Sequence, residues 1–337
     1  MTDTTLQAIA KFERAPRLDR IVLAGGSGQI GSLLARHFQG RGAKVCVLAR
    51  TTYSAPWQVT AWDGERLGEW TDQLEDADAL VNLAGRTVNC RYHRWNRRKM
   101  LESRVRSTEL LGEAIAGLRR PPRVWLNAST ATIYRHALDR PMDEGSGELG
   151  GAEKGTPETW RFSISVAKEW ERAFFAANTP GTRKVALRSA MTMSPDRGGV
   201  FDTLSRLTRM GLGGPIGSGD QFVSWIHGED FARAVDFLIE NEGIDDAVNV
   251  SSPNPLRNVA FMESLRNAWG VKVGIPTSRW MLEAGAILIR TESELVLKSR
   301  WVVPTRLIDA GFRFRFPEWA TAAQDLVEQS RLRKIRN

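Results

Sequence analysis

The amino-acid sequence predicts an α/β fold, in which a doubly wound parallel sheet carries a smaller, mostly helical lobe. Three observations support this prediction. Through the first 200 residues, short apolar segments alternate with amphipathic helical segments, which is typical of parallel strands joined by helices. A glycine-rich loop joins the first apolar segment to the first helical segment. After about Phe201 the regular alternation ends, so we expect a separate lobe there.

The first strand, loop and helix carry the strongest functional signal. Residues 24–31 read Ala-Gly-Gly-Ser-Gly-Gln-Ile-Gly, directly after the first apolar run and before a helix predicted over Ser32–Arg41. Glycines at every third position, Gly25, Gly28 and Gly31, allow a tight turn, close approach of a pyrophosphate and close packing of helix on strand. The start of the helix would offer free N–H groups to the phosphates. The loop therefore predicts a Rossmann-type site for a dinucleotide.

The end of the second strand distinguishes between two cofactors. This strand is predicted over Lys44–Ala49 and is followed by Arg50 and Thr51. NAD sites usually have Asp or Glu here for the ribose hydroxyls, whereas an arginine suits the 2′-phosphate of NADP. No acidic residue lies between Gly40 and Pro56. We therefore predict NADP as the cofactor; the alternative is that Arg50 is a solvated arginine at a strand end.

The remaining elements of the first domain continue the same alternation. The predicted strands are Gln58–Trp62, which leads to Asp63, then Ala79–Gly85, Val124–Ala128 and Lys184–Arg188. The predicted helices are Arg97–Leu118 and Trp160–Asn178, and Asp143–Pro157, rich in glycine and glutamate, is predicted to be a loop. Strands separated by helices of this length are expected to lie parallel in one sheet.

The second half of the chain predicts the smaller lobe. A glycine-rich loop is expected over Arg206–Gly219, where it would overhang the cleft, and helices are expected over Phe231–Glu240, within Pro276–Val303, and at 304–310 and 319–331. The expected division is an N-terminal extension (1–19), an NADP-binding Rossmann domain (20–200) whose sheet is completed by parts of 221–252, and a substrate lobe (201–337). This lobe would end in a small C-terminal domain at about 272–330.

Composition agrees with a globular protein. The chain has 42% hydrophobic and 26% charged residues, and no apolar run approaches the length of a membrane span. Residues 1–20 lack a hydrophobic signal core, and two cysteines give no disulfide framework, so a cytoplasmic location is expected. The net charge of +8 suits an anionic cofactor and substrate. The basic C-terminal tail is interpreted as a solvated helix end, so nucleic acid and membrane are not expected as partners.

Longer motifs resemble those of a known family. Asn82-Leu83-Ala84-Gly85 ends the fourth strand, and with the glycine loop it is similar to the extended short-chain dehydrogenase/reductase superfamily. Residues 211–219, 224–230, 248–255 and 304–312 resemble, more narrowly, its atypical epimerase-like family. Members of that family are often called sugar-nucleotide epimerases or NAD-dependent epimerase/dehydratases, and they have a small C-terminal domain of their own. The resemblance runs from about Ile21 to Val327.

The resemblance implies a catalytic group at three positions. The superfamily uses a Ser or Thr after the fifth strand to hold the substrate oxygen, and a Tyr and a Lys four residues apart on the next helix for proton transfer and ribose binding. Thr130 and Lys168 match the hydroxyl and the lysine positions, but Ile164 stands where the tyrosine is expected. A positioned general acid contributes about a hundred- to ten-thousand-fold to rate, and isoleucine supplies none.

Three interpretations of the missing tyrosine stay open. In the first, another group donates the proton: Ser163 or Ser165 on the same helix, Tyr92, Tyr134 or a bound water. In the second, NADP acts on a carbonyl or alkene that needs little acid assistance. In the third, the chain binds the nucleotide without turnover. The expected function is hydride transfer with NADP(H) on a small carbonyl or sugar-type substrate, and the alternative is a non-catalytic NADP-binding regulator or interaction protein.

The expected site residues can now be given together. The cofactor contacts would be Gly25, Ser27, Gly28, Gln29, Ile30, Gly31, Arg50, Thr51, Asp63, Leu83, Ala84, Gly85, Lys168 and Thr192. The substrate contacts would be Asn89, Tyr92, Arg188, Gln221 and Trp225, with pairing to a carboxylate as the alternative role of Arg188. His227 and Asp230 are expected to cap a helix and anchor a loop.

The sequence and the family resemblance also indicate the expected partners. The histidines have no ligand-type neighbours at metal-binding spacing, so no metal is expected. The expected partner is a small-molecule substrate. Since relatives often dimerise, a homodimer is one expected assembly.

Overall fold

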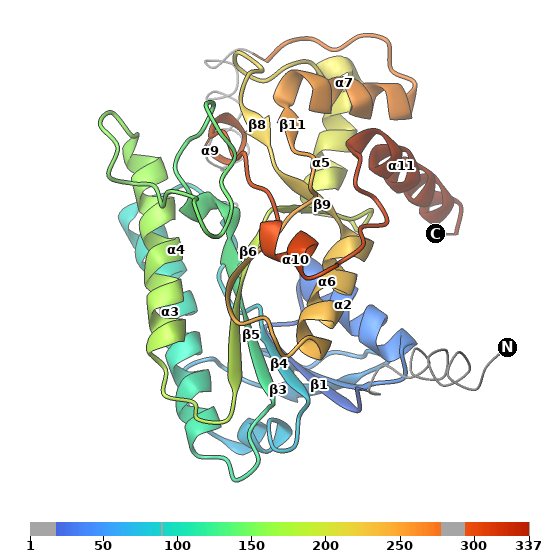
Figure 1. The fold of residues 1–337 in the computed structure, drawn as a ribbon. Helices are drawn as coiled ribbons and strands as arrows, with labels where there is room; N and C mark the ends of the chain where they lie inside the picture. The colour runs from blue at the N-terminus through green and yellow to red at the C-terminus, as the bar shows by residue number, and fades with distance from the viewer. Residues whose placement is uncertain (1–17, 89, 278–293, 337) are drawn as a thin grey trace, which may run out of the picture.

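The computed structural model describes residues 18–88, 90–277 and 294–336 (Figure 1). Its centre is a seven-stranded sheet of order β10-β6-β5-β4-β1-β2-β3, in which all neighbouring strands are parallel. The strands are β1 (Arg20–Ala24), β2 (Lys44–Ala49), β3 (Gln58–Ala61), β4 (Ala79–Asn82), β5 (Val124–Thr130), β6 (Arg183–Ser189) and β10 (Asp246–Val250). The strand order reverses between β1 and β4, and ligands of open α/β sheets bind at the carboxyl ends of the strands at such a point. The predicted fold class is confirmed.

Helices cover both faces of this sheet (Figure 1). The helices α2 (Gln29–Gly40) and α6 (Gly228–Glu240) lie on one face, and α3 (Arg94–Ala116) and α4 (Glu158–Ala176) lie on the other. The alternation of side chains along β1 accounts for both layers: Ile21 and Leu23 pack with α2 and α6, whereas Val22 and Ala24 pack with α3 and α4. Because both faces are buried, the central strands are continuous apolar runs.

A second lobe lies beyond the end of the sheet at which β5 leads into η2 (Figure 1). Its core includes the fully buried Trp225, Phe261 and Trp319, and the last two stack with ring centroids 4.1 Å apart. The strand β7 pairs with β9, and β8 pairs with β11. The shorter elements are η1 (Glu69–Gln73), η2 (Ala131–Ile133), β7 (Met191–Met193), α5 (Val200–Leu207), η3 (Thr208–Leu212), β8 (Phe222–Val223), β9 (Trp225–His227), β11 (Leu256–Arg257), α7 (Asn258–Trp269), α9 (Glu294–Leu297), α10 (Thr305–Asp309) and α11 (Trp319–Arg336).

The loop expected over Arg206–Gly219 is wrong in its first part. The helix α5 runs through Leu207 and continues into the π-helical turn η3. The reason is that glycine begins only at Gly211, whose φ of +80° breaks the helix, while Leu204 and Thr208 are buried and hold the helix in place. Only the remainder of the segment forms the glycine-rich loop.

Candidate nucleotide and substrate site

The glycine loop after β1 is packed too tightly for any other residue at two of its positions. Gly25 has a φ of +71°, and a Cβ atom there would lie 2.6 Å from the Cα of Ala84. A Cβ atom at Gly31 would overlap the backbone of Gly26. These contacts press the loop against the segment after β4 and the first turn of α2 against the loop.

The opposite side of the loop is open. A Cβ atom at Gly28 would meet nothing within 4 Å among the described residues. Gly28 also precedes α2, whose first turn has neither a side-chain cap nor an acidic residue. The side-chain nitrogen Nε2 of Gln29 is buried beside this turn and has no hydrogen-bond partner within the described chain. Open space at Gly28 and free backbone N–H groups at the start of α2 fit the oxygens of a pyrophosphate.

The end of β2 carries an exposed positive charge. Arg50 and Thr51 are exposed, and Arg50 forms no ion pair within the residues that the structure describes. Asp63, after β3, is exposed as well, and its Oδ1 accepts hydrogen bonds from the backbone N–H groups of Glu65 at 2.8 Å and Arg66 at 3.1 Å. The bond from Glu65 is the main cause that lowers the pKa of Asp63. This edge of the sheet therefore offers one free guanidinium and one firmly ionised carboxylate.

A buried amide network positions the segment after β4. The backbone N–H of Leu83 donates to Ala24 O at 2.8 Å, and that of Ala84 donates to Oδ1 of Asn82 at 3.0 Å. The fully buried Asn82 in turn donates to Oδ1 of Asn127 at 2.6 Å. These bonds end β4 at Asn82, earlier than the expected Gly85, and hold the chain beside the glycine loop. Gly85 is exposed at the surface of this wall.

Thr130, Ile164 and Lys168 lie on two elements that pack together. Thr130 ends β5, and its Oγ1 accepts a hydrogen bond from Thr132 N at 3.1 Å, while α4 packs on η2. Lys168 on α4 is half-buried, with no hydrogen bond or ion pair within the described chain. Ile164, one turn earlier, is 1% exposed because Gly150 and Gly151 lie on it. An isoleucine at this position is therefore part of the packing under the 150–151 turn.

Arg188 takes the second of its two expected roles. Its guanidinium pairs with both carboxylate oxygens of Glu171, at 2.9 and 2.8 Å, and its Nη1 donates to the Tyr134 hydroxyl at 3.0 Å. That hydroxyl donates to Oδ1 of Asn249 at 2.9 Å, and burial raises the pKa of Tyr134. We therefore no longer count Arg188 as a substrate contact, and Tyr134 belongs to this buried network.

Two other expected substrate contacts hold the second lobe together instead. Trp225 is fully buried, packs against Trp319 and donates its indole N–H to Asn254 O at 3.3 Å. Gln221 is buried, and its Nε2 donates to Ile216 O at 2.9 Å. A substrate entering from solvent reaches neither side chain in this structure. Both are withdrawn as substrate contacts because their polar atoms are used within the lobe.

Tyr92 lies beside α4. It is 7% exposed and packs edge-on against Phe162, with ring centroids 5.3 Å apart. Its hydroxyl lies 3.4 Å from Oγ of Ser163, which donates to Oε2 of Glu294 at 2.5 Å. Ser165 is exposed and donates to Phe162 O.

The remaining expected contacts differ in exposure. Thr192 on β7 and Ile30 in the loop region are half-buried, and Ser27 is exposed. Asn89 lies outside the described residues.

Sequence reasoning missed a buried charged group that joins the second lobe to η2. Lys298 is 2% exposed, and its ammonium donates to Thr132 O at 2.6 Å. The buried Arg300 donates through Nε to Oγ1 of Thr132 at 3.0 Å and lies 3.8 Å from the carboxylate of the buried Glu294. Charged residues in a segment with apolar helical spacing suggest a solvated face. Only the long-range contact with η2 shows that these residues are buried.

Burial makes stability depend on the proton of Lys298. Burial is the main cause that lowers its pKa from 10.5 to about 7, so between these values the unfolded chain binds more protons. The free energy of unfolding should therefore rise from pH 7 to pH 9. We expect Lys298→Met to be more stable than wild type at pH 6.5, with the gap narrowing by pH 9, in urea denaturation. If the free energies of unfolding of wild type and Lys298→Met changed with pH in parallel, the buried charge would be contradicted. Lys44→Met, at an exposed position, is the control.

His227, which precedes α6, and Asp230, in its first turn, have the structural role expected of them. Nδ1 of His227 accepts from Glu229 N at 3.1 Å and caps α6, while its Nε2 lies 3.0 Å from Asp325. The fully buried carboxylate of Asp230 accepts from the backbone N–H groups of Arg315 and Phe316, at 2.8 and 2.7 Å. Both residues thus fasten the last third of the chain to the sheet.

Across residues 18–88, 90–277 and 294–336 no cluster of three or more His, Cys, Asp or Glu side chains is arranged to hold a metal ion. None of the helices described in this structure combines the length and the apolar character needed to cross a bilayer.

The order of the strands, the open glycine loop and the free start of α2 define a Rossmann-type dinucleotide-binding protein of the extended short-chain dehydrogenase/reductase fold. A family model described as the NAD dependent epimerase/dehydratase family matches residues 21–251, and a second, a domain of unknown function (DUF1731), matches residues 277–326. The chain belongs to the NAD dependent epimerase/dehydratase family, as the sequence motifs indicate.

The relatives named SDR39U1 match over nearly their whole length. The epimerase family protein SDR39U1 of Bos taurus is 32% identical over 314 residues, which cover 91% of this chain and 99% of that protein. The crystal structure of human SDR39U1 (isoform 2) with NADPH has a TM-score of 0.80 at 29% identity, covering 92% of this chain and 99% of that chain. A nucleoside-diphosphate sugar epimerase from Corynebacterium glutamicum shares the fold, with a TM-score of 0.71 at 24% identity, covering 99% of this chain and 69% of that chain.

Proposed function

We propose that this chain is a cytoplasmic NADP(H)-dependent oxidoreductase of the epimerase-like type, which acts on a small carbonyl or sugar-type substrate. The observation that carries the choice of cofactor is Arg50, an exposed guanidinium at the end of β2 without an ion-pair partner in the described chain. An unpaired arginine here suits a 2′-phosphate, and a ribose diol is better served by an acid. The NADPH bound to human SDR39U1 supports the same choice.

Different residues at the carboxyl ends of the strands would bind different parts of the cofactor. The loop from Gly25 to Gly31 and the start of α2 would hold the pyrophosphate. Arg50 and Thr51 would hold the 2′-phosphate. When bound, the cofactor would supply or accept a hydride. The remaining expected contacts, Ser27, Ile30, Asp63, Leu83, Ala84, Gly85 and Thr192, would line its path along the carboxyl ends of the strands.

On the substrate side, Thr130 would hold the substrate oxygen and Lys168 the nicotinamide ribose. The group that donates the proton has to be another one, because Ile164 is apolar and buried. Tyr134 donates to Asn249 and Ser165 to Phe162 O, whereas Ser163 donates to Glu294. Tyr92 is buried against Phe162, so of the substitutes considered we propose a bound water as the proton donor. The domain division at about residue 200 and a homodimer belong to the same proposal.

Titration with the two reduced cofactors tests the proposal. We expect wild type to bind NADPH more tightly than NADH. Arg50→Ala should weaken NADPH binding about 10- to 150-fold, the effect of a lost hydrogen bond to a charged group, and leave NADH binding unchanged. Lys44→Ala removes one exposed positive charge from the other end of β2 and serves as the control. Equal binding of NADPH and NADH by wild type would contradict the role of Arg50.

Turnover separates an enzyme from a regulator. We expect NADPH consumption, followed by absorbance, with at least one member of a panel of carbonyl compounds. NADPH binding without turnover on any of them would favour the non-catalytic alternative. Undetectable binding of both nucleotides would exclude both functions.

A further inference from the structure

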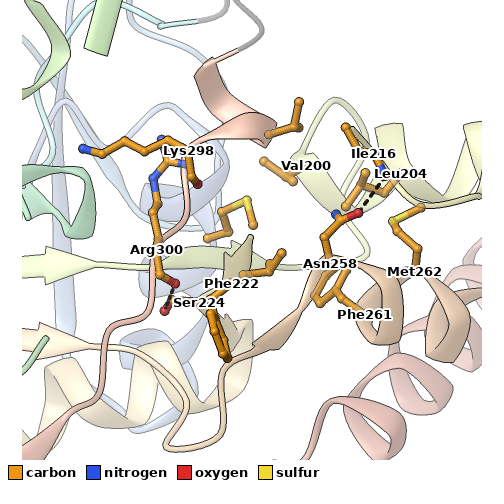
Figure 2. A pocket seen from close by; sticks show the side chains of 13 residues that line it. Val200, Leu204, Ile216, Phe222, Ser224, Asn258, Phe261, Met262, Lys298 and Arg300 are labelled. Atoms are coloured by element: carbon orange, nitrogen blue, oxygen red, sulfur yellow. Dashed lines mark hydrogen bonds between the residues drawn. The ribbon is translucent and has the colours of Figure 1, made fainter. Parts of the chain in front are cut away.

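An apolar cavity lies in the second lobe, where α5, β8 and α7 meet residues 296–300 (Figure 2). Its volume is about 40 Å³, room for about three water molecules or a few carbon atoms. The walls are formed chiefly by Met191, Val200, Leu204, Phe222, Phe261 and Met262. None of these side chains offers a strong hydrogen bond to a ligand.

The polar side chains at the cavity already have partners within the protein. Oγ of Ser224 donates to Arg300 O at 2.7 Å and accepts from Val302 N at 2.8 Å. Oδ1 of Asn258 accepts from Ile216 N at 2.8 Å. Figure 2 draws two of these contacts as dashed lines at opposite sides of the cavity. A sugar hydroxyl placed here would have to compete for them.

Lys298 and Arg300 contribute alkyl chains to the cavity wall. Figure 2 shows the ammonium of Lys298 turned away from the apolar side chains, and its hydrogen bond goes to Thr132 O. Nε of Arg300 donates to Oγ1 of the same threonine. Long cationic side chains commonly cover apolar space with their stems while their charged ends bind elsewhere. The two cations therefore do not make the cavity itself a phosphate site.

Residues that line the cavity adjoin residues of both halves of the proposed site. Met191 directly precedes Thr192, one of the expected cofactor contacts. Val200 follows Gly199, where a Cβ atom would overlap the side chain of Gln29 from the cofactor loop. On the other side, Lys298 and Arg300 connect the wall to Thr132, which donates its N–H to Oγ1 of Thr130. Thr130, at which the substrate oxygen is proposed to bind, is thus linked through Thr132 to two residues that line the cavity.

From this arrangement we infer that the substrate is a small carbonyl compound with an apolar chain, which the cavity takes up, and is not a sugar nucleotide. The inference rests on the proposed function and narrows its substrate class. Each hydroxyl of a sugar that is buried without a partner is unfavourable, whereas each buried methylene is favourable. Walls of methionine, valine, leucine and phenylalanine therefore select for the chain and against the sugar.

A homologous series of ligands tests the inference on the full chain saturated with NADP+. Straight-chain 2-ketones from propanone to 2-octanone are titrated by ligand-observed NMR, with UDP-glucose as the comparison. We expect the Kd to fall about fourfold for each added methylene until the cavity is full. UDP-glucose should neither bind nor displace the ketone. A Kd that does not change with the length of the ketone, or displacement of the ketone by UDP-glucose, would overturn the inference.

A filling substitution adds a second readout. Val200 is partly exposed at the start of α5, so Val200→Phe can extend into the cavity without cutting into the core. We expect at least tenfold weaker ketone binding and an unchanged Kd for NADPH. Val273→Phe, at a more exposed valine that does not line the cavity, is the matched control. Equal ketone binding by both variants would place the ligand elsewhere, whereas a wild type that fails to bind NADPH would refute the proposed function itself.

Discussion

Replacing Gly31 with alanine will both destabilise the protein and weaken NADPH binding at least 100-fold. The added Cβ atom would overlap the backbone of Gly26, which belongs to the same loop and cannot rotate away as a side chain can. Overpacking a close contact typically costs about 1–3 kcal/mol, and a clash between backbone atoms lies at the upper end or beyond. We expect a loss of about 3 kcal/mol in urea denaturation and at least 100-fold weaker NADPH binding, because the loop and the start of α2 must separate.

Two other glycines of the same segment provide matched controls. At Gly28 a Cβ atom meets no described atom within 4 Å, so Gly28→Ala should fold normally. It should nevertheless weaken NADPH binding, because this open space is where the pyrophosphate is expected. Gly40, the last residue of α2, also has space for a Cβ atom, and Gly40→Ala should leave binding unchanged. Normal NADPH binding by Gly31→Ala, or strong destabilisation by Gly28→Ala, would contradict this account of the loop.

How much could be predicted from the sequence depended on the range of the interactions. The strand Lys44–Ala49 has the predicted bounds because both faces of a central parallel strand are buried, so its apolar run marks its ends. The helix after the loop begins at Gln29 and not at Ser32, since its first turn is held by the backbone of the loop. Such starts leave little signal in side-chain periodicity.

The parts that escaped prediction depend on distant contacts. Lys298 and Thr132 are 166 positions apart, and nothing local to either residue indicates that they meet. The partner of Arg188 was predictable in kind, a carboxylate, but Glu171 sits on an amphipathic helix among other charged residues that face solvent. The missing tyrosine at Ile164 could be read from spacing alone, whereas the covering turn at Gly150 and Gly151 could not. Local chemistry thus identified the cofactor loop, and tertiary packing decided the substrate side.

The pair formed by Arg188 and Glu171 carries the second large prediction. Both side chains are about nine-tenths buried, and the carboxylate also accepts from Oγ of Ser129 at 2.6 Å. Arg188→Met would leave the carboxylate of Glu171 buried without its cation. Removing one partner of a buried ion pair typically costs about 3–5 kcal/mol, and we expect a loss of this size in urea denaturation at pH 7.

The double variant Arg188→Met/Glu171→Leu should recover most of that stability, because two apolar side chains of similar volume leave no uncompensated charge. The exposed pair Arg98–Glu102 on α3 is the control, and Arg98→Met should leave the unfolding midpoint almost unchanged, since solvent already screens that pair. If Arg188→Met behaves like Arg98→Met, the ion pair does not hold β6 to α4. Because Ser129 and Thr130 are neighbours on β5, a displaced Glu171 should also shift Thr130, and weaker ketone binding by the single variant than by the double variant would show that this network positions the substrate oxygen.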